Sequence, residues 1–378
     1  MSETLTRTVC VKLDVGENSP ALTATQAAFN EASTWIALVC WDEHITNTNT
    51  AHHRVYGETR ARFGLGAQLA CCARAKAVEA IKAGKVKGRD TCPAFGPRGS
   101  IRYDARTYRL MALDRVSLNT LSGRVVCQMV PGARQRAMLM DLSWKIGGSD
   151  LVWRDGVYFL HLTQTREAPE TDESGGVLGV DLGQTQLAVD SDGDAFSGAK
   201  VKGIRHYYAR RRATLQAAGT RSATRRLKII KRRESRFMRD TNHVISKTLV
   251  AKAANTRKAL ALEDLTGIRE RVTVRRVQRS YRMSWAFSQL RQQIAYKAAT
   301  AGVPVVLVDP RNTSRTCHVC GHCEKANRHS QASFLCRSCG FSCCADLNAA
   351  VNIAYRAVAN QPMVPSGQRD RRGTSPRL

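Results

Sequence analysis

The chain has 378 residues, which is enough for two or three domains with sizeable hydrophobic cores. Its 59 Lys and Arg residues outnumber its 31 Asp and Glu residues, so the formal net charge is +28. A surplus of this size is typical of a protein that binds a polyanion and disfavours an enzyme without a charged partner. Because the cations are spread over many segments and not gathered on one amphipathic helix, nucleic acid fits as the partner better than a membrane surface.

The N-terminal half predicts a small β-barrel with helices inserted into it. Residues 6–13 alternate between polar and apolar and predict an opening strand. Apolar residues at helical spacing predict helices over about 25–41 and 53–83. A Gly- and Pro-containing loop follows, and Asp155-Gly156 later predicts a hairpin turn. The short β runs of this half lie at 101–103, 116–118, 125–130, 151–153 and 157–162.

The pattern changes in the second half of the chain. The polar stretch 168–176 predicts a linker between domains. Beyond it, apolar runs that predict strands alternate with segments that predict helices, which is typical of an α/β nuclease fold. The predicted strands lie at 177–180, 187–189, 259–262 and 303–308. The predicted helices lie at 204–240, 244–254 and 346–358, with another that contains Trp285, Phe287, Leu290, Ile294 and Tyr296.

The segment 204–240 is densely cationic. It holds thirteen Lys or Arg residues against two acids, Glu234 and Asp240. Like charges three or four residues apart weaken an isolated helix, so we expect a polyanion beside this segment. A solvated helical face is the alternative. The candidate nucleic-acid contacts here are Arg210, Arg211, Arg212, Arg225, Arg226, Arg232 and Arg233.

Three acids occupy positions where such a fold can gather metal ligands. Asp181 and Glu263 each follow an apolar strand-like run, and Asp346 begins the last predicted helix. Mg²⁺ prefers carboxylate oxygen, and two such ions can activate a water and stabilise both reacting oxygens in phosphodiester hydrolysis. Asp181 would bridge the two ions, while Glu263 and Asp346 would each complete one side. Each acid alone also fits a cap or a turn, so only their joint placement predicts the metal site.

Two Cys-x-x-Cys-Gly motifs predict a structural zinc site. Their cysteines are Cys317, Cys320, Cys336 and Cys339, and fifteen residues lie between Cys320 and Cys336. Four unrelated buried thiols are the alternative, which the matched motifs disfavour. Other nearby residues could also supply ligands, but none repeats the motif, so we expect them to lie outside the zinc site: Cys323, Cys343, Cys344, His318, His322 and His329.

Cysteine usage also bears on the compartment. Thirteen cysteines, with the adjacent pairs Cys71-Cys72 and Cys343-Cys344, fit a reducing compartment with bound metal better than a secreted disulfide scaffold. The sequence has neither a signal peptide pattern nor a long apolar stretch. We therefore expect a soluble, intracellular protein.

These motifs, in this order, resemble those of TnpB, a family of RNA-guided endonucleases from bacterial insertion sequences that is similar to the compact type V CRISPR effectors. Residues 179–183 (GVDLG) resemble the family's first RuvC motif, residues 262–265 (LEDL) the second and residues 346–353 (DLNAAVNI) the third. Residues 313–321 resemble the entry into its zinc ribbon. The resemblance covers nearly the whole chain.

The resemblance implies a multidomain α+β architecture. A wedge-like β-barrel would lie at the N-terminus, with recognition helices inserted into it. A RuvC-like (RNase H-like) α/β nuclease domain would follow, with an inserted zinc ribbon. We expect a disordered tail, rich in Pro, Gly, Ser and Arg, at the C-terminus. The implied ranges are 1–20 and 90–170 for the barrel, 21–89 for the helices, 175–312 and 341–360 for the nuclease, 313–340 for the ribbon and 361–378 for the tail.

The resemblance also implies an activity. Asp181, Glu263 and Asp346 match the family's catalytic acids, which implies Mg²⁺-dependent cleavage of double-stranded DNA at a site chosen by a guide RNA. Arg315, in the loop before the ribbon, is a candidate contact to the phosphate of the cleaved strand. The cytoplasm of a bacterium, at the nucleoid, is the implied location, and monomer and dimer both stay open.

Three other functions stay open at this point. A guided repressor would bind DNA without cutting it, although the intact acids disfavour this function. A type V CRISPR effector would have a repeat array beside its gene in place of transposon ends. An unguided RuvC-like nuclease would cleave independently of RNA sequence.

Overall fold

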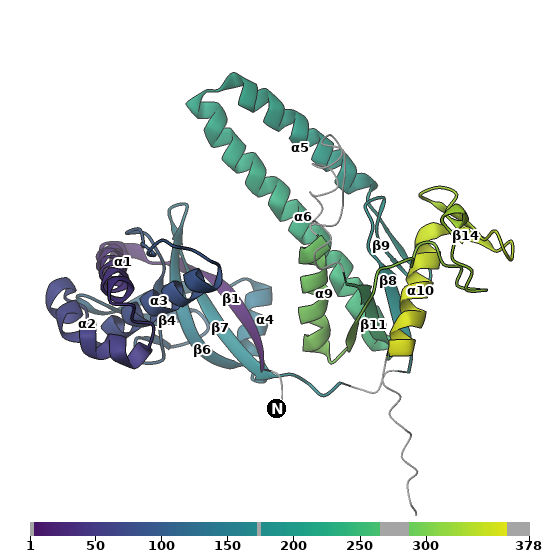
Figure 1. Ribbon diagram of the computed structural model, residues 1–378. Helices are drawn as coiled ribbons and strands as arrows, with labels where there is room; N and C mark the ends of the chain where they lie inside the picture. Colours follow the sequence, from purple (N-terminus) through teal and green to yellow (C-terminus); the bar gives the residue numbers. More distant parts are fainter. Residues whose placement is uncertain (1–3, 172–174, 265–286, 361–378) are drawn as a thin grey trace, which may run out of the picture. The chain divides into compact units, whose positions relative to one another are not determined.

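The computed structural model describes residues 4–171, 175–264 and 287–360, which divide into two units between Glu167 and Ala168 (Figure 1). Three sequence predictions lie outside the described residues. They concern Trp285 of a predicted helix, Leu265 of the second RuvC-like motif and the tail 361–378.

Seven antiparallel strands of the first unit form a nearly closed barrel in the order β2-β6-β7-β1-β5-β4-β3. The edge strand β3 approaches the opposite side of the sheet, where the hydroxyl of Tyr108 donates to the carbonyl oxygen of Gly147 in β6, the strand next to the other edge. Alternate residues of β1 point inward, and Val11 is fully buried. The strands are β1 (Thr4–Asp14), β2 (Ile101–Tyr103), β3 (Tyr108–Leu110), β4 (Arg115–Thr120), β5 (Gly123–Val130), β6 (Lys145–Arg154) and β7 (Val157–Glu167).

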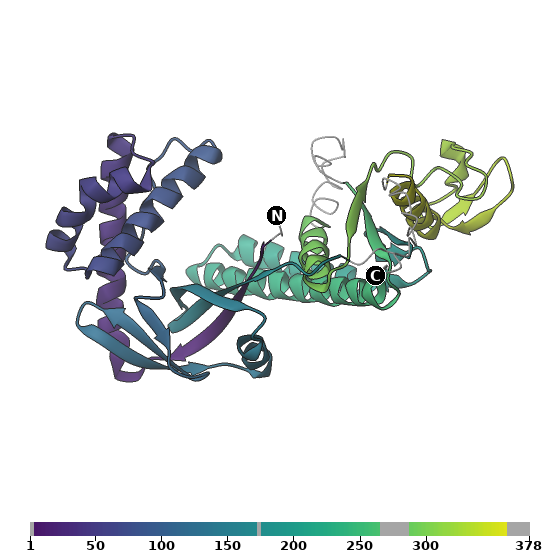
Figure 2. The same cartoon turned by 90° about the horizontal axis from the view of Figure 1, so that it is seen from below.

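Three helices are inserted between β1 and β2, where the sequence predicts an insertion of two (Figure 2). They are α1 (Ser19–Asp42), α2 (Thr48–Phe63) and α3 (Ala67–Val86), and a short 3-10 turn, η1 (Gly16–Asn18), precedes them. Phe29 of α1 and Leu69 of α3 are fully buried and join the core of the barrel.

The prediction of one helix over about 53–83 was wrong, because the chain breaks at Gly64. This glycine ends α2 with a φ of 64°, a left-handed conformation that glycine adopts without a steric cost. The sequence analysis also missed β3 and the helix α4 (Ala133–Met140). Leu139 is the one buried residue of α4, so this helix carries little apolar periodicity.

The second unit is built on a five-stranded sheet in the order β10-β9-β8-β11-β12. The inner strands β8, β11 and β12 are parallel, while β9 and β10 form an antiparallel hairpin at one edge. All four predicted strands of this half are confirmed. The strands are β8 (Val177–Asp181), β9 (Gln186–Asp190), β10 (Ala195–Ser197), β11 (Ala259–Glu263) and β12 (Val305–Val308).

Helices cover both faces of this sheet, which gives the α/β layering that the sequence predicts (Figure 1). On one face, α6 (Arg221–Asn255) and α9 (Phe287–Ala301) pack against Leu178 and Leu260 of the sheet. On the other face, α10 (Ala345–Asn360) packs against Ala261 through Ile353.

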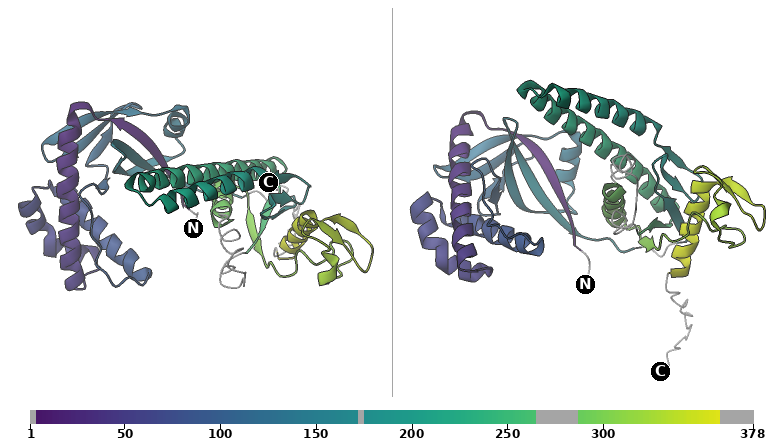
Figure 3. Two further views of the ribbon diagram at one scale, coloured as in Figure 1. Left: turned by 90° about the horizontal axis from the view of Figure 1, so that it is seen from above. Right: turned by 45° about the horizontal axis from the view of Figure 1, so that its top comes forward.

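The basic segment forms a long helical hairpin that projects beyond the sheet of its own unit (Figure 3). Its first helix is α5 (Ala199–Ala218), and Gly219, with a φ of 62°, makes the turn into α6. The side chain of Thr220 caps α6 by accepting from the backbone N–H of Ala223. The helical predictions for 204–240 and 244–254 are confirmed, and the structure adds that the break between the two helices lies at Gly219 and that residues 221–255 form one continuous helix.

The segment of the chain between β12 and α10 forms a small lobe. It contains the 3-10 turn η2 (Lys325–Asn327) and the two-stranded antiparallel sheet of β13 (Ser333–Leu335) and β14 (Ser342–Cys344). No helix among the described residues is long and apolar enough to cross a membrane.

Candidate active site and cysteine cluster

Asp181 is the last residue of the central strand β8. Leu178 and Val180 of this strand are fully buried, which fixes the register that leaves Asp181 at the end of the strand. Gly179 lets α10 approach this strand closely, because a Cβ there would overlap the carbonyl oxygen of Ala350. The first glycine of the GVDLG motif therefore allows α10 to lie next to the strand that carries Asp181.

Glu263 ends the neighbouring strand β11. The two strands are parallel with Leu262 beside Val180, so Glu263 and Asp181 follow as the next residues at the same edge of the sheet. The hydroxyl of Thr313 donates a 2.5 Å hydrogen bond to Oε1 of Glu263. Thr313 is almost fully buried, and its bond fixes one oxygen of the carboxylate.

Asp346 comes from the first turn of α10, which packs against β8. Its Oδ1 atom lies 3.4 Å from Nη2 of Arg328, and the same nitrogen donates to the carbonyl oxygen of Gln331. Arg328 follows η2 in the lobe between β12 and α10, so a cation from this lobe reaches the acids. The sequence analysis missed Arg328, because no motif or spacing links it to Asp346.

The three acids share one electrostatic environment. Burial, together with the charges of Glu263 and Asp346, raises the pKa of Asp181 to about 7. Burial also raises the pKa of Glu263, against the hydrogen bond from Thr313, and raises the pKa of Asp346, against the charge of Arg328. Asp181 thus lies within reach of the charges of both other predicted acids.

Such a group fits hydrated divalent cations. Mutual repulsion in a desolvated site falls when cations bind between the carboxylates. Mg²⁺ binds through one or two carboxylates and keeps several waters, so the carboxylates need not be as closely gathered as the thiolates around a zinc ion. The chemistry of the donor set therefore favours Mg²⁺ over a softer metal.

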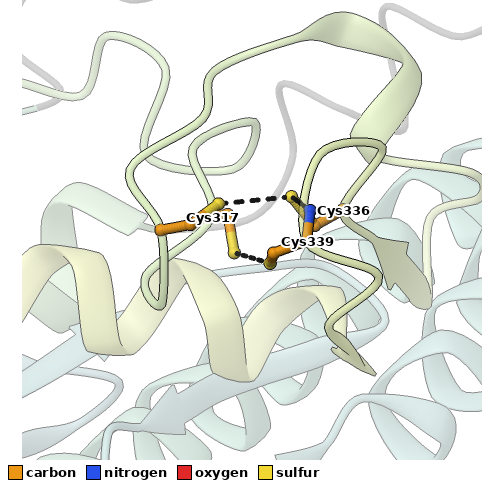
Figure 4. A group of neighbouring side chains, drawn as sticks. Cys317, Cys336 and Cys339 are labelled. Atoms are coloured by element: carbon orange, nitrogen blue, oxygen red, sulfur yellow. Dashed lines mark hydrogen bonds between the residues drawn. The ribbon is translucent and has the colours of Figure 1, made fainter.

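The four cysteines of the two Cys-x-x-Cys-Gly motifs meet in the lobe, with side chains from two loops pointing toward one another (Figure 4). Their sulfur atoms all lie within 4.8 Å of one another. The Cys317 and Cys339 sulfurs are 3.8 Å apart, and those of Cys320 and Cys336 are 3.5 Å apart. Four thiolates at Zn–S distances of about 2.3 Å form a tetrahedron with edges of about 3.8 Å, so the cluster fits a structural zinc ion.

The backbone around the cluster is shaped for metal binding. Gly321 and Gly340, which follow the second cysteine of each motif, have φ values of 76° and 72°. The backbone N–H of Cys339 donates to the sulfur of Cys336, and this hydrogen bond lowers the pKa of the Cys336 thiol, which favours the thiolate that zinc requires. Cys323, Cys343 and Cys344 lie outside the cluster, as the sequence analysis expects.

Two buried asparagines of α10 hold the segment that leads into the cysteine lobe. Asn352 donates to the carbonyl oxygens of Thr313 and Thr316, at 2.9 and 2.7 Å. Asn348 donates to the carbonyl oxygen of Thr316 and accepts from the backbone N–H of His318. The DLNAAVNI motif thus supplies both Asp346 and the bonds that hold Thr313 beside Glu263.

The predicted basic contacts lie on two different structures. Arg315 is exposed in the loop before the cysteine lobe. The others lie on α5 and α6, where most are exposed, but the guanidinium of Arg212 is hydrogen-bonded to Glu234. Arg212 therefore already has a protein partner within the hairpin. The residues on the hairpin are Arg210, Arg211, Arg212, Arg225, Arg226, Arg232 and Arg233.

Two family models match the second unit and the end of the first. The OrfB model of IS605, described as "Probable transposase", matches residues 160–267 and spans the strands of Asp181 and Glu263. The model described as "Cas12f1-like, TNB domain" matches residues 287–353 and spans the cysteine cluster and Asp346.

Curated relatives carry related names. The chain is 30% identical over 249 residues to the CRISPR-associated endodeoxyribonuclease Cas12f1 of Sulfoacidibacillus thermotolerans, covering 60% of this chain and 57% of that one. It is 28% identical over 189 residues to the TnpB-like protein MJ0751 of Methanocaldococcus jannaschii, covering 47% and 67%. It is 40% identical over 83 residues to the putative RNA-guided DNA endonuclease InsQ of Escherichia coli K12, covering 21% of each. The chain spans 57% and 41% of two Cas12f relatives.

Solved structures share the fold. A cryo-EM structure of a Cas12f1-sgRNA-target DNA complex aligns with a TM-score of 0.63 at 15% identity, over 88% of this chain and 82% of that one. The mini-RNA-guided endonuclease CRISPR-Cas phi3 aligns with a TM-score of 0.59 at 10% identity, over 95% and 93%. The fold is thus Cas12f-like, with an N-terminal barrel, an OrfB region of the RuvC type and a zinc-ribbon-like domain with four cysteines.

Proposed function

Because this chain belongs to the TnpB/OrfB family of IS605-type transposase proteins, which is related to Cas12f, we propose that it is an RNA-guided DNA endonuclease. The observation that carries the proposal is the gathering of Asp181, Glu263 and Asp346 from three separate elements at one edge of the sheet. Separate elements that bring three repelling carboxylates together favour a metal-dependent function over three independent caps.

Asp181, Glu263 and Asp346 would together hold two Mg²⁺ ions. When bound, the ions supply an activated water and stabilise charge on the attacking and leaving oxygens of the phosphodiester. The chain contributes the ionised carboxylates and their orientation. Thr313 holds one oxygen of Glu263 in place, and Asn352 holds Thr313.

Two arginines would contact the DNA phosphates. The guanidinium of Arg328 already lies beside Asp346, where it can donate hydrogen bonds to the phosphate under attack. Arg315 lies farther along the approach to the cysteine lobe and is exposed. We assign Arg328 to the reacting phosphate and Arg315 to the backbone of the cleaved strand.

The partners would be a guide RNA and a double-stranded DNA target. The net charge of +28 and the cations of the α5–α6 hairpin support a large polyanion partner. In this proposal residues 1–20 and 90–170 are the wedge-like barrel, 21–89 the recognition helices, 175–312 and 341–360 the nuclease, and 313–340 the zinc ribbon. Base pairing to the guide would select the target.

The names of the relatives raise a second candidate function with the same chemistry, in which the guide RNA comes from a CRISPR locus instead of an insertion sequence. Several Cas12f relatives are CRISPR-associated, whereas InsQ and MJ0751 carry TnpB-type or RNA-guided names. The RNA bound to the purified protein would separate the two settings. A transcript of a transposon end indicates the insertion-sequence setting, and a repeat-spacer transcript indicates the CRISPR setting.

The test is to co-express the chain with the DNA that flanks its gene, purify the complex and sequence its RNA. The complex is then incubated with matching and non-matching DNA in the presence and absence of Mg²⁺, beside Asp181→Ala. Glu31→Ala, which removes an exposed acid of α1, serves as the matched control.

We expect a discrete RNA and Mg²⁺-dependent cleavage of the matching DNA alone, retained in the control and lost in Asp181→Ala. Bound RNA without cleavage by the unmutated protein would indicate a guided repressor. Cleavage that ignores the RNA sequence would indicate an unguided nuclease.

A further inference from the structure

One face of α6 carries a straight row of cations. Arg221, Arg225, Lys228, Arg232, Arg236 and Arg239 follow one another at spacings of three or four residues, and all six are exposed. At 3.6 residues per turn these side chains fall within about 80° of the helix circumference and extend over about 27 Å. We call these six residues the α6 stripe.

The opposite face of the same helical segment is occupied by the protein itself. Ala223 and Ile230, half a turn away from the stripe, are buried, and α6 packs there against α5. Farther along α6, Ile245 and Leu249 are buried in the core of the sheet. The helix is therefore held by α5 along its first half and by the core of the sheet along its second half. The stripe is a rigid surface that points away from these contacts.

The stripe repels itself. Neighbouring cations at three or four residues along a helix each cost a few tenths of a kcal/mol, and the row contains five such neighbours in succession. Of the two acids between residues 204 and 240, Glu234 pairs with Arg212 on another face, and Asp240, four residues after Arg236, can offset the repulsion only at the end of the stripe. A bound row of phosphates would offset the repulsion, and a partner that stays bound would do so permanently.

The composition of the stripe indicates which polyanion fits. Single-stranded nucleic acid is commonly held by aromatic side chains on which its bases stack, and no residue from Arg221 to Arg236 is aromatic. The same segment also contains neither Asn nor Gln, which read base edges. A straight row of cations matches the regular phosphates of a double helix, which it would bind without reading the sequence.

We propose that the α6 stripe binds the phosphate backbone of a double-helical part of the guide RNA. This inference rests on the proposed function and assigns a partner to one surface of it. The guide RNA is favoured over the target DNA because the guide stays bound between targets and so offsets the repulsion along the stripe at all times.

The test compares two triple variants of the full chain. The stripe variant carries Arg221→Gln, Arg225→Gln and Arg236→Gln, and the flank variant carries Arg226→Gln, Lys231→Gln and Arg233→Gln. Both lose three charges from the same helix, and glutamine keeps a similar helix propensity. A third protein carries Arg221→Lys, Arg225→Lys and Arg236→Lys, which retains the charge. Circular dichroism and thermal unfolding verify that each variant is folded.

Each protein is co-expressed with the flanking DNA, and the RNA retained per chain is measured. RNA-free protein is then titrated at several NaCl concentrations with three probes: the RNA recovered from the unmutated complex, a blunt RNA duplex of mixed sequence and one separated strand of it. Binding of target DNA is measured separately with the loaded complexes.

We expect the stripe variant to bind the recovered RNA at least about tenfold more weakly at 0.15 M salt, with a salt slope reduced by about 2 to 3. The loss should be larger for the duplex than for the single strand, and smaller in the flank variant and in the lysine variant. Equal losses in the stripe and flank variants would overturn the proposal. Unchanged RNA binding with weakened binding of target DNA would assign the stripe to DNA and also overturn it.

The proposed function fails separately. If the unmutated protein retains no discrete RNA and cleaves no matching DNA, the guided function is wrong, and the stripe assignment falls with it. If the unmutated protein retains a discrete RNA and cleaves matching DNA, but the stripe and flank variants lose RNA binding equally, the guided function stands and the stripe assignment is wrong.

Discussion

Asp346 on α10 lies 3.4 Å from Arg328, which belongs to the lobe that the four cysteines hold together. Both side chains are largely shielded, with exposed fractions of 15% and 30%. The pair links the cysteine lobe directly to the acids at the sheet edge. Metal binding in the lobe and catalysis at the acids should therefore depend on each other.

Arg328→Gln should lower the rate of DNA cleavage by about 10²-fold, because it removes a charged donor aimed at the site of the developing charge. Arg328→Lys should recover part of this loss, since lysine keeps the charge but not the forked geometry. RNA retention should not change. Arg337→Gln, at an exposed arginine of the same lobe, is the matched control. Full activity of Arg328→Gln in single-turnover cleavage would contradict this role.

Thr313→Val should slow cleavage by about tenfold, because it removes the hydroxyl that fixes Glu263 while keeping the shape of the side chain. Thr313→Ser should keep most of the activity. The comparison is Thr316→Val, whose hydroxyl bonds only to the carbonyl oxygen of Asn312 among the described contacts. If both valine variants slow cleavage equally, the bond to Glu263 has no special part in the reaction.

Asp181→Asn should stabilise the protein in Mg²⁺-free buffer above neutral pH. The pKa of Asp181 is raised from 3.8 to about 7 in the folded protein, so its contribution to stability is complete below pH 3.8 and is lost as the pH rises toward 7. The advantage of Asp181→Asn in the free energy of unfolding should thus grow between pH 5 and pH 8, to on the order of 2 kcal/mol. Adding Mg²⁺ should reduce it. Urea unfolding at several pH values measures this difference, and a constant difference would refute the assigned environment.

Cys336→Ser should lower the zinc content from about one ion per chain to near zero, because structural sites use all four ligands. The same variant should lose DNA cleavage, since Arg328 and Thr313 are both placed by the lobe or its entry, yet keep RNA bound to α6. Cys323→Ser, outside the cluster, should keep both zinc and activity. Elemental analysis and cleavage assays on the same preparations check this, and a cleaving, zinc-free Cys336→Ser protein would break the predicted link.

Local patterns in the chain predict a large part of the fold. Strand ends at Asp181 and Glu263 follow from buried apolar runs, and the cysteine cluster follows from two short motifs that each form a tight loop. Arg328 and Thr313 carry no such signal, because they reach the acids through contacts that only the folded chain creates. For the same reason the sequence does not reveal that Arg212 is bound to Glu234.

The sequence predicts that these helices exist more reliably than it predicts where they begin and end. Gly64 and Gly219 each end a helix in a left-handed conformation, yet a glycine alone does not mark a break, because Gly57 lies inside α2. The length of α6 depends on its second half packing against the sheet, so its continuity from Arg221 to Asn255 is a consequence of tertiary structure.

Exchange of the guide sequence tests the central claim most directly. The guide segment of the bound RNA is replaced with an unrelated sequence, and the complex is offered two DNA duplexes, one matching the old guide and one the new, in Mg²⁺. We predict that cleavage moves entirely to the new match and disappears with Asp181→Ala. Continued cleavage of the old match, or cleavage by Asp181→Ala, would contradict an RNA-guided reaction at the three acids.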